Sequence, residues 1–135
     1  MTELVLDASV LLKWFRREGE EHLEHALALR SAFQEGQIVL LTPSLVELEL
    51  INVAGRRWRW GEDRLVALAA RIRRIGLRLV EPEPERVARW TGRGLTAYDA
   101  AYVAVAEAAG APLITSDEVV LSTAGPIARP LSRYR

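Results

Sequence analysis

Four acidic residues stand where apolar segments of the sequence end or are interrupted: Asp7, Glu49, Asp99 and Asp117. A carboxylate is costly to bury without a partner, because its charge loses its hydration. Carboxylates that converge at the ends of strands and helices therefore indicate a bound cation. Oxygen ligands suit hard ions such as Mg²⁺ or Mn²⁺, which can assist a hydrolysis reaction.

The hydrophobic pattern predicts the elements that must position these acids. The predicted strands are Glu3–Asp7, Gln37–Leu41, Leu77–Val80, Leu113–Thr115 and a last one near Ile127. The predicted helices are Ala8–Phe15, Glu20–Gln34, Ser44–Trp58, Glu62–Ile75, Glu85–Trp90, Thr96–Ala109 and Glu118–Ser122.

Strands that alternate with helices and are apolar throughout indicate a parallel sheet that is covered on both faces. The chain of 135 residues is long enough for one such α/β domain and too short for two. Ligands of these folds bind beyond the carboxyl ends of the strands. Asp7 and Asp117 both follow a strand at that end, which supports a site there.

Helix capping is a competing explanation for three of the acids. Asp7 precedes the helix that begins at Ala8, and Asp117 precedes the short last helix. Thr96 and Asp99 have the spacing of a capping box. Taken singly, each acid is better explained as a cap, so the prediction of a site depends on their occurring together in one fold.

Glu49 lies in the middle of a predicted helix, where it can cap nothing. At about 100° per residue it shares a face with Leu45, Val46 and Asn52. Asn52 is therefore a possible hydrogen-bond partner for its carboxylate. Glu47 lies about 160° away around the same helix and cannot share that pocket.

The opposite face of this helix carries Leu50, Ile51 and Ala54, which are apolar as well. A helix with apolar residues on both sides is expected to pack against its own core and against another chain. Large apolar patches are uncommon on soluble monomers. The pattern therefore predicts a homodimer.

The composition excludes several classes of protein. The chain has no cysteine, which rules out disulfides, zinc–thiolate sites and a cysteine nucleophile. Its first residues lack the basic region of a signal peptide, and no apolar run approaches the roughly 20 residues that span a bilayer. We expect a cytoplasmic protein that does not bind a membrane.

The formal net charge is zero, but the positive charge is concentrated in one segment. Residues Arg56–Arg78 hold eight arginines against two acids, and Trp58 and Trp60 lie among them. This segment is either a solvated helix face or a surface for phosphate or a partner. His22 and His25 are one turn apart, but glutamates surround them, so we expect a solvated polar face there rather than a metal site.

Four segments together resemble the PIN domain family, and within it the VapC ribonuclease toxins of type II toxin–antitoxin pairs. They are Asp7-Ala8-Ser9 after the first strand, Pro43 followed by Glu49 and Asn52, Leu95–Ala100, and Ala111–Asp117. The resemblance covers residues 1–135 as a single domain. It implies a three-layer α/β/α fold with a central, mainly parallel sheet.

The resemblance also implies an activity and its site. Asp7, Glu49, Asp99 and Asp117 would be the catalytic and metal-binding quartet for Mg²⁺ or Mn²⁺, with Ser9, Asn52 and Thr115 as supporting residues. The substrate would be RNA, and the partners a small cognate antitoxin and a second copy of the chain. Glu118 departs from the family, since many relatives carry a basic residue there.

Two other classes of protein are alternatives to a ribonuclease. A phospho-receiver domain also sets acids at strand ends, but it needs a lysine after a late strand, and the only lysine is Lys13. A catalytically inactive PIN-like interaction module would bind a partner without cleaving RNA.

Overall fold

The computed structural model describes residues 2–134. Its centre is a sheet of five strands in the order β3-β2-β1-β4-β5, and every neighbouring pair is parallel. The strands are β1 (Thr2–Leu6), β2 (Ile38–Thr42), β3 (Arg78–Leu79), β4 (Leu113–Thr115) and β5 (Ala128–Pro130). The central strand, β1, and its neighbour β4 lead to Asp7 and Asp117.

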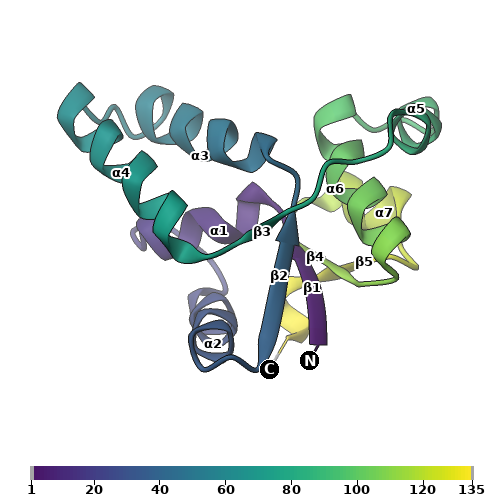
Figure 1. The fold of residues 1–135 in the computed structure, drawn as a ribbon, viewed down its shortest axis with the longest axis horizontal. Helices are drawn as coiled ribbons and strands as arrows, with labels where there is room; N and C mark the ends of the chain where they lie inside the picture. Colours follow the sequence, from purple (N-terminus) through teal and green to yellow (C-terminus); the bar gives the residue numbers. More distant parts are fainter. Residues whose placement is uncertain (1, 135) are drawn as a thin grey trace.

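Helices cover both faces of this sheet (Figure 1). The seven α-helices are α1 (Ala8–Phe15), α2 (Leu23–Gln34), α3 (Leu45–Arg56), α4 (Glu62–Ile75), α5 (Pro84–Gly92), α6 (Ala97–Ala109) and α7 (Glu118–Thr123), and a 3-10 turn spans Leu131–Arg133. Helices α1 and α2 contact the sheet on one side, and α6 contacts it on the other with α5 packed against it. This arrangement confirms the expected three-layer α/β/α fold.

The observed elements agree closely with those predicted from the hydrophobic pattern. Helices Ala8–Phe15 and Glu62–Ile75 have the predicted bounds. Helix α2 begins later than predicted, at Leu23, because His22 adopts a left-handed backbone conformation with φ of 56°. A residue in that conformation cannot continue a right-handed helix.

Helix α6 lies deepest in the molecule. Its residues from Ala100 to Ala106 are all buried, and four of them are alanine, so the helix backbone can approach the sheet closely. Tyr102 is the largest of the fully buried side chains. Within residues 2–134, no helix is long and apolar enough to cross a membrane.

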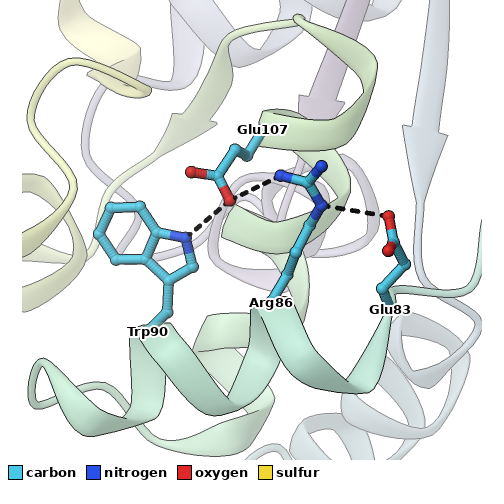
Figure 2. Close-up of polar contacts among 4 residues, drawn as sticks. All are labelled: Glu83, Arg86, Trp90 and Glu107. Carbon is cyan, nitrogen blue, oxygen red and sulfur yellow. Dashed lines mark hydrogen bonds and ion pairs between the residues drawn. The ribbon is translucent and has the colours of Figure 1, made fainter.

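A polar cluster fastens α5 to the outer side of α6 (Figure 2). The Glu107 carboxylate accepts hydrogen bonds from Trp90 Nε1 at 3.2 Å and from Arg86 Nη1 at 3.1 Å. Arg86 also donates from Nε to Glu83 at 3.1 Å. Helix α6 therefore contacts α5 through this cluster and also packs on the sheet.

Helix α3 packs against α1 and α4 within the chain. Leu50 is 1% exposed and Ala54 is 0% exposed within this single chain, so the expectation that both need a partner was wrong. Sequence periodicity showed an apolar face but could not show that α4 packs on it. Arg73 of α4 also pairs with Glu47 at 2.9 Å. The uncovered apolar residue on α3 is Leu48, which is 71% exposed.

Candidate metal centre

The candidate centre begins at the carboxyl edge of the sheet. Asp7 directly follows β1, and Asp117 lies two residues beyond β4, the strand that pairs with β1. Parallel strands bring their carboxyl ends to the same edge. The fold therefore places these two acids at the same edge of the sheet, after neighbouring strands, although they are distant in the sequence.

The carboxylate of Asp7 is buried and held by two hydroxyl groups. Ser9 Oγ donates to Oδ1 at 2.5 Å, and Thr115 Oγ1 donates to Oδ2 at 2.5 Å. Each hydroxyl is oriented in turn by a backbone N–H, from Ser116 to Ser9 at 3.0 Å and from Asp117 to Thr115 at 3.0 Å. Asp7 occupies the N-cap position of α1, but these hydroxyls fix the direction of its carboxylate.

Burial raises the pKa of Asp7 from 3.8 to about 6. The hydrogen bonds from Ser9 and Thr115 oppose this shift, and the negative charge of Asp99 adds to it. A carboxylate whose charged form is disfavoured in this way would be stabilised by a nearby cation. No ion pair of the described residues joins any of the four acids to an arginine, lysine or histidine.

Glu49 faces α6 and accepts a short hydrogen bond from the phenol of Tyr102. Burial raises the pKa of Glu49, the bond from Tyr102 opposes that shift, and the charge of Asp99 adds to it. Burial and the contact with Glu49 raise the pKa of Tyr102, so the phenol remains a neutral donor. Asn52, the partner considered from the sequence, is exposed and makes no hydrogen bond to Glu49 within residues 2–134.

Tyr102 was missed by the sequence analysis. A signal was present, because Tyr102 follows Asp99 by three residues and so lies on the same side of a helix. It is also the only residue of the buried stretch Ala100–Ala106 with a hydrogen-bonding side chain. A buried tyrosine hydroxyl usually finds a polar partner.

Asp99 and Asp117 begin α6 and α7, and each takes part in capping. The backbone N–H of Asp99 donates to Thr96 Oγ1 at 3.1 Å, and the Asp117 carboxylate accepts from the N–H of Val120 at 3.0 Å. Burial raises the pKa of Asp99, and the charge of Asp117 raises it further. Capping by Asp117 therefore coexists with a position near the other acids.

The four acids act on one another electrostatically, with Asp99 as the common member. Its charge raises the pKa of Asp7 and of Glu49, while Asp117 raises the pKa of Asp99. Within residues 2–134, no three of the four carboxylates come within 4.8 Å of one another. The donor set is carboxylate oxygen supported by hydroxyl groups, which fits a hard divalent cation that keeps some of its waters.

The basic segment Arg56–Arg78 is divided between paired and unpaired arginines. Arg73 pairs with Glu47 and Arg78 with Glu3. Trp58 and Trp60 are half-buried with ring centroids 5.1 Å apart, and the Arg64 guanidinium lies 3.8 Å from the Trp60 centroid. The two tryptophans line a pocket of about 610 Å³ together with Arg16, Arg17, Arg59 and Arg64.

Comparison with known proteins gives one family and several similar folds. The sequence model described as PIN domain matches residues 4–126. A search of curated proteins returns no match to the chain. The crystal structure of PAE2754 from Pyrobaculum aerophilum has a TM-score of 0.66 and 25% identity, covering 96% of this chain and 90% of that one.

Two further solved structures are less similar in sequence. VapC20 of Mycobacterium tuberculosis, described as a Sarcin-Ricin loop cleaving toxin, has a TM-score of 0.67 and 21% identity over 90% of this chain and 95% of that one. The structure of FitAB bound to an IR36 DNA fragment has a TM-score of 0.67 and 16% identity, covering 98% of this chain and 97% of that one. At these identities the two comparisons show a shared fold.

Proposed function

Because the chain belongs to the PIN domain family, whose members are generally nucleases, we propose that it is a metal-dependent endoribonuclease. We further propose that it is the toxin of a type II toxin–antitoxin pair. The observation that carries the proposal is the buried Asp7 carboxylate, held by Ser9 and Thr115 and acted on by the charge of Asp99. Burying this charge without a cationic partner is unfavourable unless a cation binds nearby.

Asp7, Glu49, Asp99 and Asp117 would hold Mg²⁺ or Mn²⁺. When bound, the ion would polarise the scissile phosphate and lower the pKa of a water molecule for in-line attack. Ser9 and Thr115 orient both oxygens of Asp7, and Tyr102 orients Glu49 from the neighbouring helix. These contacts reduce the rearrangement that the ligands need when they bind the ion.

RNA, a small antitoxin and a second copy of the chain are the proposed partners, and the cytoplasm is the proposed location. Two structural neighbours support the toxin hypothesis and a nucleic acid as partner, since VapC20 is described as a Sarcin-Ricin loop cleaving toxin and FitAB as bound to a DNA fragment. Leu48, the exposed apolar residue of α3, is a candidate contact for the dimer. Sedimentation at tens of micromolar checks this, and a stable monomer would contradict it.

The nuclease is tested with purified protein and labelled single-stranded RNA. We expect cleavage in Mg²⁺ or Mn²⁺, none in excess chelator, and recovery when the ion is restored. Asp7→Asn and Asp99→Asn should each reduce cleavage by at least roughly a hundredfold while circular dichroism shows a native fold. Undiminished cleavage in chelator would refute the metal mechanism, and an inert wild-type protein would favour the interaction module.

A further inference from the structure

The chain has two histidines and no cysteine, and both histidines lie at the start of α2. Nitrogen or oxygen ligand atoms of His22, Glu24 and His25 all lie within 4.8 Å of one another. No other trio of histidine, aspartate and glutamate within residues 2–134 is this close. The only imidazoles of the protein are thus gathered beside one carboxylate, outside the acidic centre at the sheet edge.

The two ring nitrogens of His25 have different partners. Nδ1 lies 2.7 Å from the carbonyl oxygen of Tyr134, and a carbonyl can only accept, so Nδ1 carries the proton. In the neutral ring this leaves the lone pair on Nε2. A metal-binding histidine is usually oriented in this way, because its second nitrogen donates to a carbonyl or carboxylate.

The nitrogen of His25 that carries the lone pair, Nε2, lies close to the carboxylate of Glu24. This atom lies 3.4 Å from Glu24 Oε1. Two ligands that each bind a tetrahedral Zn²⁺ at about 2.0–2.1 Å are separated by roughly 3.4 Å, so this spacing fits two corners of such a site. The distance between these two atoms is therefore the one that a shared ion requires.

His22 supplies the third ligand through an unusual backbone conformation. Its φ of 56° is in the left-handed region, which a residue other than glycine rarely adopts. This conformation places its ring 5.9 Å from the ring of His25, between centroids. Backbone strain of this kind is often found where a side chain is needed in a particular place.

The electrostatic surroundings add negative charge to offset the positive end of α2. Glu24 lies in the first turn of that helix, and Glu21 lines the same pocket of about 400 Å³ as His22. Imidazole ligands favour Zn²⁺, Ni²⁺ or Co²⁺, whereas Mg²⁺ favours oxygen alone. The cluster and the acidic centre therefore select different ions.

We propose that His22, Glu24 and His25 form a second cation site, which binds a transition metal of the zinc type with water in the remaining position. The site shares no ligand with Asp7, Glu49, Asp99 or Asp117. Because Nδ1 of His25 contacts the Tyr134 carbonyl, the bound ion also stabilises the contact between the start of α2 and the C-terminal residues. This inference does not depend on the proposed ribonuclease activity.

The test is zinc titration of untagged protein by calorimetry and thermal unfolding, with millimolar Mg²⁺ present to occupy the acidic centre. We expect one Zn²⁺ per chain and, at a hundredfold excess over Kd, a Tm increase of roughly 5–10 °C. His22→Asn keeps a residue that tolerates the left-handed conformation, and Glu24→Gln keeps the size of the side chain. Each should weaken zinc binding by about tenfold or more, while the control Glu35→Gln, at the C-terminal end of α2, should leave it unchanged.

A second measurement identifies the ligands directly. With only two histidines in the chain, ¹⁵N spectra of the imidazoles are simple, and both rings should shift on zinc addition. In Asp99→Asn protein, zinc binding should be retained even though cleavage is lost, which separates this site from the catalytic one. The absence of binding, or binding that His22→Asn and Glu24→Gln leave unchanged, would overturn the proposal.

Discussion

At the scale of single residues, Asp7 combines two properties that compete. It is 6% exposed, so its charge is poorly hydrated, yet hydroxyl groups hold both of its oxygens in place. Such a residue lowers the stability of the metal-free protein, but its carboxylate is already oriented to bind a cation. This competition can be measured as a dependence of stability on pH.

We predict that Asp7→Asn stabilises the metal-free protein at pH 7.5. The pKa of Asp7 is raised from 3.8 to about 6 on folding, so the native state keeps a proton that the unfolded state loses between these values. Stability contributed by the protonated form is therefore lost as pH rises from about 4 to 6, by up to roughly 3 kcal/mol. The variant avoids this loss, but part of its advantage is offset because the amide nitrogen of Asn cannot accept the hydrogen bond that Ser9 or Thr115 donates to Asp7.

Chemical denaturation in chelator at several pH values checks this prediction. The advantage of Asp7→Asn should shrink below pH 5, where the wild-type carboxyl group is protonated. As a control, Mg²⁺ should stabilise the wild type and have little effect on the variant. A variant that is less stable than the wild type at pH 7.5 in chelator would contradict the prediction.

Tyr102 is expected to position Glu49 without touching substrate. Tyr102→Phe removes one hydroxyl from a buried ring and leaves its packing intact. We expect cleavage to require roughly 10–100 times more Mg²⁺, because contacts that orient metal ligands have effects of this size. The exposed Tyr98→Phe is the matched control, and a magnesium titration with equal midpoints for both variants would exclude the positioning role.

At the scale of elements, α6 organises the candidate centre. Its first turn carries Asp99 and its next turn carries Tyr102, so the angle of this one helix decides where both side chains lie. The buried alanines set its distance from the sheet, and the Glu107 cluster with α5 restrains its outer side. Packing on two sides makes α6 a rigid support.

We predict that Glu107→Ala destabilises the protein by about 1 kcal/mol. The change removes the acceptor for both Arg86 and Trp90, and the indole N–H loses its bond in a buried ring. The partial exposure of Glu107 keeps the effect modest. Urea denaturation measures it, with Arg89→Ala, an exposed residue of α5, as the control. Equal midpoints for the two variants would show that the cluster contributes nothing.

At the scale of the whole molecule, opposite charges are separated in a chain whose net charge is zero. The sheet edge gathers carboxylates, which repel a phosphate backbone. Arg17 and Arg59 line the pocket beside Trp58 and Trp60 and form no ion pair within residues 2–134, so they are available to attract it, although Arg64 already covers one face of Trp60. RNA binding by this surface therefore remains a prediction from charge and aromatic content.

We predict that Arg59→Ala weakens RNA binding and lowers its dependence on salt. In an Asp99→Asn background that prevents cleavage, the slope of log affinity against log salt should fall by about 0.7 for each lost phosphate contact with single-stranded RNA. Arg56→Ala and Arg57→Ala extend the test along the segment. Arg129→Ala, exposed on β5, is the control. If the slope of log affinity against log salt is unchanged in all three arginine variants, the segment is a solvated surface that does not contact RNA.

The sequence alone determined the elements and the family. Apolar periodicity, glycine and proline positions and capping residues are local signals, so the bounds of α1, α4 and β4 could be predicted to the residue. The resemblance carried by the segments around Asp7, Asp99 and Asp117 led to the PIN domain family, which is confirmed. The assignment of the acidic quartet as metal ligands stays a prediction.

Only the tertiary structure decided which side chains meet across long separations. The contact between Glu49 and Tyr102 spans 53 positions, and the one between Asp7 and Thr115 spans 108. The cover that α4 gives to α3 and the approach of His25 to Tyr134 are likewise invisible in local patterns. Periodicity gives the direction of a side chain around its own helix, whereas the partner it meets depends on how the helices pack on the sheet.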